Sequence, residues 1–372
     1  MDFPQILPFA PKGSEWETNG MKKKATLVAF FLIDRSWVSI RWRLFFPKGC
    51  DLQKIPFSRQ LTALMLCAAC AVGFSGETQK PQPSLRTIRF GTLPVIQALP
   101  LFVAAEKGFF SASGIKVELE SFQSGTEKDV ALTAGQISGY FGDLLTPTVI
   151  RANGAPVKIV AQNFNTTGKR RMFAIVAAPG RTAATLTDVA REGIGAGSNT
   201  IVEYLTAKLL ATRNISESNL KMIEIKSIPI RFQMLMSGQV AAAALPEPLV
   251  TLAEMKGGRV LMDDAGLNLS PTVLVFEEKM LRDHPDTVRL FLKSVDKAAA
   301  YINDHPEEIR EIMNRNCRIP EALQKTFAVP SFPKLTRPNP SQWKSVHDWL
   351  RQKKIIRNDI TYEQTVDDRY LS

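Results

Sequence analysis

The sequence predicts an α/β protein with two lobes, each a mostly parallel sheet covered by helices. Short β-branched or alternating runs recur between stretches of helical periodicity, which is typical of strands and helices that alternate around a parallel sheet. A seven-residue unit occurs twice, at residues 131–137 and 234–240, each time as a helix end with Gly followed by Gln and a strand. The length of 372 residues is also enough for about two domains.

The first series of elements begins at about Arg86. Its expected strands are Ile88–Leu93, Ile115–Phe122, Gly139–Asp143, Val157–Gln162 and Phe173–Ala178, and its expected helices are Leu99–Phe110, Glu127–Gly135 and Leu144–Ala152. Alternation of this kind places the helices between successive strands of one sheet.

The second series has the same character. Its expected strands are Gly193–Gly197, Leu220–Ile225, Val240–Leu245 and Arg259–Met262, and its expected helices are Thr200–Arg213 and Ile230–Ser237. After Pro271–Phe276 only helical patterns remain, at Asp286–Asn303, Pro306–Asn314, Pro320–Lys325 and Ser341–Lys353. We expect this C-terminal region to pack on one of the two sheets.

Residues 1–69 are interpreted as a leader that takes no part in the fold. The stretch from Lys54 to Ala69 has a positive start, a short apolar core and a small-residue end, as secretory signals have. Cys70 follows at once and resembles the lipidated Cys of bacterial lipoproteins, although Cys67 stands where Leu is usual. Lipidation at Cys70, ordinary cleavage between Ala69 and Gly76, and no cleavage stay open. Residues 1–50 are too long for a signal, and two explanations stay open, a wrongly assigned start or an unusual leader. Residues 70–86 form a tether.

The composition excludes several functional classes. Of the formal net charge of +11, the leader carries +5, so the remainder gives no reason to expect nucleic-acid binding. The chain lacks a Gly-x-x-x-x-Gly-Lys-Ser/Thr phosphate loop, so it is not an ATPase of that type. Cys317 has no Cys or His beside it and is interpreted as structural. The run from Lys169 to Arg171 is expected to be a solvated turn, and we expect no metal, cofactor or catalytic residue.

Three segments carry a family resemblance. The run from Arg89 to Leu119, with its Glu-Lys-Gly-Phe-Phe element at Glu106–Phe110, is similar to the opening of periplasmic substrate-binding proteins of ABC transporters. The branch it resembles binds nitrate, sulfonates, taurine or thiamine pyrimidines, and the similarity continues through Met236–Ala243 and Glu247–Pro248. The resemblance implies the type 2 periplasmic-binding fold, with two hinge crossings and the ligand clamped between the lobes. We assign residues 87–178 and 270–372 to lobe 1 and residues 179–269 to lobe 2.

The candidate ligand-binding residues follow the strands, because ligands of open α/β sheets bind beyond the carboxyl ends of the strands. The Gly-rich run Gly195–Thr200 is the strongest candidate, since its backbone can approach a ligand and a helix follows it. In the alternative interpretation, Ser198 or Asn199 only caps that helix. The full set is Leu93, Pro94, Gln97, Ser124, Gly125, Thr126, Asp143, Thr146, Asn163, Ser198, Asn199, Thr200 and Glu247.

Asp143 and Glu247 bear on the charge of the ligand. A carboxylate in a closing cleft costs desolvation unless it is paired, so these two favour an amine on the ligand or an Arg across the cleft. In the alternative interpretation, Asp143 caps the helix at 144–152 and Glu247 lies at the start of a helix at 247–256. Helix N-termini favour an anion, so a zwitterion satisfies both kinds of group.

The favoured function is a solute-binding lipoprotein of an ABC importer, anchored through Cys70 on the periplasmic or outer face of a bacterial membrane. It would bind a small polar solute as a monomer and deliver it to an inner-membrane permease. Two alternatives stay open, an enzyme on the same fold that resembles thiamine-pyrimidine synthases and a sensor for a membrane signalling protein.

Overall fold

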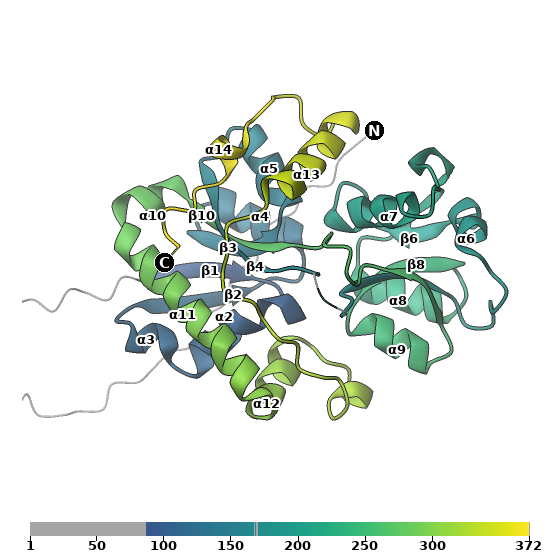
Figure 1. Ribbon diagram of the computed structural model, residues 1–372, viewed down its shortest axis with the longest axis horizontal. Helices are drawn as coiled ribbons and strands as arrows, with labels where there is room; N and C mark the ends of the chain where they lie inside the picture. Colours follow the sequence, from purple (N-terminus) through teal and green to yellow (C-terminus); the bar gives the residue numbers. More distant parts are fainter. Residues whose placement is uncertain (1–86, 167, 169, 372) are drawn as a thin grey trace, which may run out of the picture. The chain divides into compact units, whose positions relative to one another are not determined.

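Two five-stranded mixed sheets form the framework of the chain (Figure 1). The structure is a computed structural model that describes residues 87–166, 168 and 170–371. The leader, the tether and Cys70 lie outside these residues. No helix in the described part of the chain is both long and apolar enough to cross a membrane.

The first sheet has the strand order β2-β1-β3-β10-β4. Its strands are β1 (Thr87–Thr92), β2 (Lys116–Ser121), β3 (Gly139–Asp143), β4 (Val157–Phe164) and β10 (Thr272–Glu277). β1 is parallel to β2 and β3, and β10 is antiparallel to β3 and β4. Four strands therefore run in one direction, which confirms the prediction of a mostly parallel sheet.

The second sheet repeats this plan with the order β7-β6-β8-β5-β9. Its strands are β5 (Phe173–Ala177), β6 (Ile194–Ala196), β7 (Met222–Glu224), β8 (Ala242–Pro246) and β9 (Arg259–Asp263). β5 is the reversed strand, since it is antiparallel to both β8 and β9. The assignment of residues up to 178 to lobe 1 is wrong here, because Phe173–Ala177 is hydrogen-bonded into the second sheet.

The carboxyl ends of the parallel strands in both sheets lie beside the segments that connect the sheets. The chain passes from β4 to β5 through residues 165–172 and returns from β9 to β10 through residues 264–271. Asp143 at the end of β3 pairs with Thr272 at the start of β10, and Pro246 at the end of β8 pairs with Phe173 at the start of β5. The two edges where ligands of α/β sheets bind therefore both adjoin these crossings.

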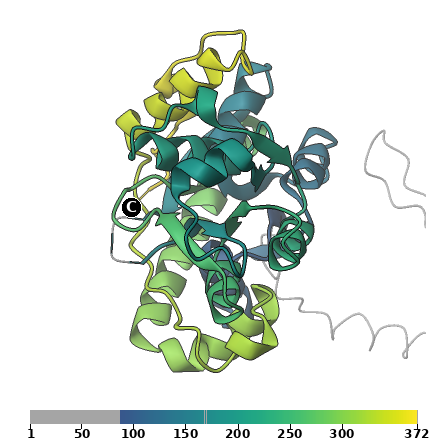
Figure 2. The ribbon, with the colours of Figure 1, turned by 90° about the vertical axis from the view of Figure 1, so that its right-hand side faces the viewer.

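Helices cover both faces of the first sheet (Figures 1 and 2). One face carries α2 (Leu99–Glu106), α3 (Phe109–Ala112), α10 (Glu278–Asp283), α11 (Pro285–Asp304) and α12 (Pro306–Asn316), with the 3-10 helices η2 (Ile96–Ala98) and η4 (Glu321–Leu323) nearby. The other face carries α4 (Gly125–Thr133), α5 (Leu145–Ala152), α13 (Pro340–Gln352) and α14 (Tyr362–Thr365). The C-terminal region was expected to pack on one of the two sheets, and its helices do pack on the first sheet. They cover both faces of that sheet.

The core of lobe 1 is centred on three phenylalanine rings. Phe90 of β1 and Phe276 of β10 lie 4.7 and 5.3 Å from Phe291 of α11, centroid to centroid. All three side chains are fully buried. Such ring contacts add to the burial of apolar area, so this cluster fixes the long helix α11 on the sheet.

Lobe 2 has a helix pair on each face of its sheet. One face carries α6 (Leu186–Glu192) and α7 (Ile201–Ala211), followed by the 3-10 helix η3 (Glu217–Asn219), and the other carries α8 (Ile228–Met236) and α9 (Leu249–Met255). Apolar residues of lobe 2 also reach lobe 1, since Leu252 joins the core cluster of the α2 face, and Tyr204 and Leu205 join that of the α13 face.

The repeated seven-residue unit has the same structure in both lobes. After α4 and α8 the chain turns through Gly135 (φ +68°) and Gly238 (φ +71°), a conformation that favours glycine. The amide of Gln136 donates to Ala131, and that of Gln239 donates to Met234, both at 2.9 Å. The two lobes are therefore equivalent at an offset of 103 residues in this region.

Candidate functional site

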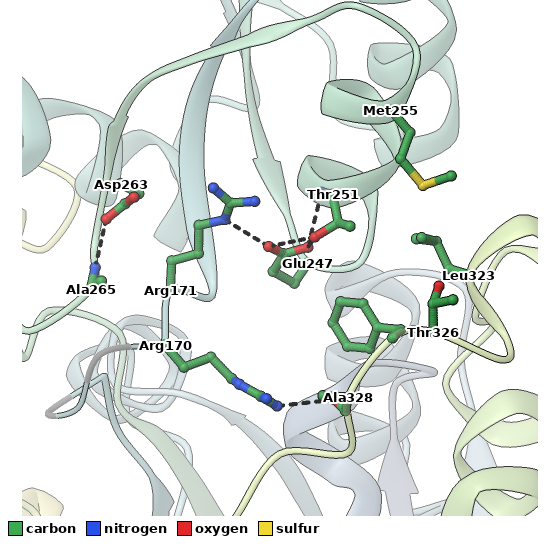
Figure 3. Close-up of a pocket in the computed structure, with 11 residues that line it drawn as sticks. Arg170, Arg171, Glu247, Thr251, Met255, Asp263, Ala265, Leu323, Thr326 and Ala328 are labelled. Atoms are coloured by element: carbon green, nitrogen blue, oxygen red, sulfur yellow. Dashed lines mark hydrogen bonds and ion pairs between the residues drawn. The ribbon is translucent and has the colours of Figure 1, made fainter.

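A cavity of about 690 Å³ lies at the crossings (Figure 3). Its wall comes from the first crossing, from the ends of β8 and β9 with α9, and from the C-terminal segment that follows α12. The lining residues are Arg170, Arg171, Glu247, Thr251, Met255, Asp263, Ala265, Leu323, Thr326, Phe327 and Ala328. Both lobes therefore contribute to this cavity.

Glu247 and Arg171 form an ion pair in the wall of the cavity. Arg171 Nε donates to Glu247 Oε1 at 2.8 Å, and the guanidinium also pairs with Glu254 of α9. The side chains of Arg171 and Glu247 are 21% and 6% exposed. Burial lowers the pKa of Arg171, but its bonds to Glu254 and Glu247 outweigh burial and leave the pKa above its ordinary value. The charge of this pair is thus largely balanced within the protein.

Glu247 also holds the first turn of α9. Its Oε2 accepts the backbone N–H of Thr251 at 3.1 Å, and the Thr251 hydroxyl donates to the same oxygen at 2.9 Å (Figure 3). The sequence left two interpretations of Glu247 open, a place at the start of a helix or a pair with an Arg. The structure shows both, since Glu247 binds the first turn of α9 and pairs with Arg171. Because Arg171 neutralises Glu247, this carboxylate gives less reason to expect an amine on the ligand. Contact with a ligand stays a prediction.

Asp264 ties the two crossings together. Its Oδ1 accepts the backbone N–H groups of Met172 at 2.7 Å and Phe173 at 2.9 Å, and the Ser270 hydroxyl donates to Oδ2. The side chain is fully buried, and burial raises the pKa of its carboxyl. The second crossing is thereby fixed to the first, which makes Asp264 the central polar group of the hinge.

Of the run from Lys169 to Arg171, expected to be a solvated turn, Lys169 lies outside the described residues, Arg170 is exposed as expected, and Arg171 is largely buried. Arg170 Nη1 donates to the carbonyl of Ala328 at 3.0 Å, and Arg171 points to the lobe 2 carboxylates. The run thus links the hinge to lobe 2 and to the C-terminal segment of lobe 1. Sequence reasoning missed Arg171, Asp264 and residues 323–328 because their partners are distant along the chain. The only signal was a pair of arginines next to a strand.

On lobe 1, the structure brings the predicted residues together in small groups. Asn163 Nδ2 donates to the carbonyl of Gln97 at 2.9 Å, and both residues are buried. Asp143 Oδ1 accepts the amides of Leu145 and Thr146 at 2.8 and 2.9 Å, so it caps α5. The remaining predicted residues of this lobe lie in the turn after β1 and at the start of α4, and they are Leu93, Pro94, Ser124, Gly125 and Thr126.

On lobe 2, the Gly-rich run is capped differently from the expectation. Thr200, rather than Ser198 or Asn199, caps α7, because its hydroxyl oxygen accepts the amide of Val202 at 3.2 Å. The amide of Ser198 donates to Glu224 at 2.9 Å, and that of Asn199 to Glu203 at 2.6 Å. The donors proposed for a ligand are thus held by two carboxylates of lobe 2. Of the predicted residues, Glu247 is the one that lines the cavity described above.

Helix α13 connects the lobes on the other side of the hinge. Tyr204 of α7 donates to Ser345 at 3.0 Å, and Lys353 Nζ lies 2.7 Å from Glu203 and 3.0 Å from Glu217. A smaller cavity of about 280 Å³ adjoins these contacts. Since Glu203 also accepts the Asn199 amide, α13 is coupled to the Gly-rich run.

The comparison with protein families identifies the fold. The family described as NMT1/THI5 like matches residues 96–309, which is more than half of the chain. The chain belongs to the NMT1/THI5-like family. This agrees with the resemblance seen in the sequence, and the chain has the two-lobed fold of periplasmic binding proteins.

Relatives of this NMT1/THI5-like chain include binding proteins for sulfonates. An aliphatic sulfonates-binding protein of Bacillus subtilis (strain 168) is 25% identical over 265 residues, which cover 68% of this chain and 75% of that protein. The periplasmic aliphatic sulphonate binding protein SsuA of Escherichia coli has a similar structure, with a TM-score of 0.65 at 16% identity over 76% of this chain and 92% of that chain.

The alkanesulfonate-binding protein SsuA of Xanthomonas axonopodis pv. citri, bound to MOPS, gives a TM-score of 0.64 at 15% identity. The match covers 77% of this chain and 98% of that chain. At these identities the structural matches establish the shared fold.

Proposed function

We propose that this chain is the solute-binding component of an ABC importer. It captures a small polar solute between its lobes and delivers it to a membrane permease. The observation that supports this most strongly is that the carboxyl edges of both sheets adjoin two crossings, with a cavity of about 690 Å³ walled by both lobes. Membership of the NMT1/THI5-like family supports the same conclusion.

The mechanism is closure of the two lobes about the crossings. Only the crossings join the lobes covalently, and Asp264 fixes one crossing to the other through the amides of Met172 and Phe173. A solute that contacts both lobes binds the closed form more tightly than the open form, so it shifts the population toward closure. The permease can then distinguish loaded from empty protein by the arrangement of the lobes.

The solute class proposed here is a small organic oxyanion of the sulfonate type. The names of the Bacillus subtilis relative and of the two SsuA structures support it. The internal pairing of Glu247 with Arg171 supports it too, since this carboxylate needs no cation from the ligand. The family resemblance also includes proteins that bind thiamine pyrimidines, so solutes of the amine or pyrimidine type stay open as a second class. Nitrate and taurine should be tested together with them.

The enzyme alternative would need a reactive group, and Cys317, interpreted above as structural, is the free cysteine in the described part of the chain. Cys317 is 2% exposed, and burial raises the pKa of its thiol well above the ordinary value. A thiol held in its protonated form is a poor nucleophile, which argues against this role.

The site of action is proposed to be the outer face of a bacterial membrane, with a lipid on Cys70. Labelling with palmitate in growing cells, with and without globomycin, tests the anchor. We expect label in the wild-type chain and none in the Cys70→Ala variant; label that persists in that variant contradicts the anchor and leaves solute binding unaffected.

Thermal-shift screening tests the binding function. We expect at least one of ethanesulfonate, taurine, nitrate, simple amines and pyrimidines to raise the melting temperature of the purified chain, because ligand binding to the native state stabilises it. Melting temperatures that stay unchanged with every solute, at concentrations up to tens of millimolar, contradict the proposal.

A further inference from the structure

Each lobe buries one cationic side chain at the same place. Lys128 in the first turns of α4 and Arg231 in the first turns of α8 are separated by 103 residues, the offset of the repeated unit. Each packs on a glycine of a parallel strand, Gly91 of β1 or Gly195 of β6, since a Cβ on Gly91 would lie 3.2 Å from Lys128 Cγ and one on Gly195 would lie 3.5 Å from Arg231 Cγ. Lys128 is 2% exposed and Arg231 is 1% exposed.

The cation of lobe 1 has partners among its neighbours. Lys128 Nζ lies 3.0 Å from the carboxylate of Asp129 and 3.4 Å from the centroid of the Tyr140 ring. The N-terminus of α4 is also occupied, because Ser124 caps it and Glu127 stands in its first turn. Lys128 therefore has a carboxylate and an aromatic ring as partners within lobe 1, which offset part of the cost of its burial.

The cation of lobe 2 has no such neighbours. At the offset of 103, Phe232 stands where lobe 1 has Asp129, and Ala243 stands where it has Tyr140. Arg231 Nη1 donates to the carbonyl of Ile225 at 3.0 Å, but Nε and Nη2 are buried with no hydrogen-bond partner in the described structure. Helix α8 has no side-chain cap from Ser227 and no acid in its first turn.

The two nitrogens without partners are the pair with which arginine binds oxyanions side-on. Elsewhere in the same chain, Arg369 uses Nε and Nη2 to hold Asp367 at 2.8 and 2.7 Å, and Arg310 uses them to hold Glu307 at 2.9 and 2.8 Å. A buried guanidinium costs free energy unless an anion or acceptors pair with it. The vacant fork of Arg231 therefore favours an oxyanion.

The surroundings of Arg231 contain one opposing carboxylate. The charge of Glu224 acts on Arg231, but burial dominates and lowers the pKa of Arg231 to about 10, so the group is still cationic at neutral pH. Glu224 Oε2 is already occupied by the amide and hydroxyl of Ser198. It does not hydrogen-bond to Arg231 and leaves the fork open.

We propose that Arg231 is the oxyanion-binding residue of lobe 2, where its Nε–H and Nη2–H hold the negatively charged group of the solute. The amides in the first turn of α8 add a favourable dipole. This inference rests on the proposed function and adds the residue that recognises the charge of the ligand. The N-terminus of α8, which carries Arg231, is open to solvent at its outer residues, since Ser227 and Pro229 are exposed and Ile230 is 51% exposed.

Three variants of the full chain test the inference. Arg231→Met removes the charge and the fork at similar length, Arg231→Lys keeps the charge without the fork, and Arg369→Met removes an exposed arginine whose fork Asp367 occupies. The probes are sodium sulfate, nitrate, acetate and ethanesulfonate against sodium chloride at equal ionic strength, with ethanesulfonamide as an uncharged counterpart. Melting curves without added probe establish that each variant folds.

The expected result is that at least one oxyanion binds the wild type, and that Arg231→Met and Arg231→Lys weaken it by about 10- to 100-fold, the loss expected for hydrogen bonds to a charged group. Arg369→Met should bind as the wild type does. Affinity of Arg231→Met within about twofold of the wild type overturns the inference. So does a wild type that binds an uncharged solute but no oxyanion, and in that case the proposed function stands. A wild type that binds nothing contradicts both.

A second readout reports on the fork in the wild type itself. In a chain labelled with ¹⁵N-arginine, the Nε–H resonance that is missing from Arg231→Lys belongs to Arg231. We expect this resonance to shift when the bound oxyanion is added, and a resonance that stays in place while the anion binds overturns the inference.

Discussion

The carboxylate of Asp264 accepts the backbone N–H of Met172 at 2.7 Å, which joins the two crossings between the lobes. The same carboxylate accepts the amide of Phe173 and the hydroxyl of Ser270. These contacts fix the path of both crossings relative to each other. Hinge closure in this protein is therefore expected to occur around a rigid polar centre, with the movement in the residues that flank it.

Replacement of Asp264 tests this centre. Asp264→Ala leaves two amides without an acceptor, and each costs about 1–3 kcal/mol, so we expect a loss of about 2–6 kcal/mol in the free energy of unfolding by urea titration. The neighbouring Asp263→Ala removes one hydrogen bond, to Ala265, from a half-buried side chain and should cost about 1 kcal/mol or less. Equal losses in the two variants would contradict the role of Asp264.

The ion pair between Arg171 and Glu247 gives a second test. Arg171→Met leaves a nearly buried carboxylate without its charge partner, so we expect destabilisation by about 1–3 kcal/mol, less than for a fully buried pair. Arg181→Met removes an exposed pair with Glu192 and should change the free energy of unfolding by about 0.5 kcal/mol or less. Chemical denaturation of both variants checks the difference, and a cost for Arg171→Met no larger than that for Arg181→Met would sink the assignment.

The glycines beneath the two buried cations should differ in their tolerance of a methyl group. A Cβ on Gly91 would lie 2.6 Å from Cδ1 of Ile137, which is 1% exposed, whereas a Cβ on Gly195 would lie 3.2 Å from Cδ1 of Ile225. Overpacking costs about 1–3 kcal/mol, so Gly91→Ala should lose that amount and Gly195→Ala less. Thermal melts of the two variants measure the order, and the reverse order would show that the packing at these sites is misjudged.

The buried Lys128 predicts a dependence of stability on pH. Burial lowers the pKa of its ammonium in the folded state, so the folded chain binds fewer protons than the unfolded chain between that pKa and the ordinary value of about 10.4. The contribution of Lys128 to the free energy of unfolding therefore rises as the pH increases from its folded-state pKa to about 10.4. We expect Lys128→Met to gain stability relative to the wild type at neutral pH, and the gain to shrink by pH 10.

Urea titrations of Lys128→Met and wild type at pH 7 and pH 10 provide this measurement. A difference between the two chains that is constant over this range would mean that the ammonium is not desolvated as the structure indicates.

The sequence predicted most of the strands because their apolar runs are short and bounded by turn residues. Strand β3 was predicted at its observed bounds, Gly139–Asp143, and the repeat at residues 131–137 and 234–240 anticipated the equivalence of the lobes. The lobe boundary at 178 was wrong because a strand pattern contains no information about which sheet the strand joins. The apolar pattern of Phe173–Ala177 would fit a strand of either sheet, and only its pairing with β8 and β9 assigns it to the second.

The site was predictable only in part. Glu247 was found because it follows a strand directly, a local signal, and it does line the cavity. Arg171, Asp264 and Arg231 escaped notice because their significance depends on partners or on missing partners that only the fold brings together. Arg231 is informative because Phe232 and Ala243 replace the compensating groups present in lobe 1, and that substitution becomes visible once the two lobes are compared.

Calorimetric titration of the purified chain with ethanesulfonate, taurine and nitrate tests the central claim, that this protein binds a small oxyanion between its lobes. We expect saturable binding of at least one of these solutes, with one site per chain. The absence of a binding heat for all three, repeated at two temperatures so that a vanishing enthalpy cannot hide binding, would contradict it.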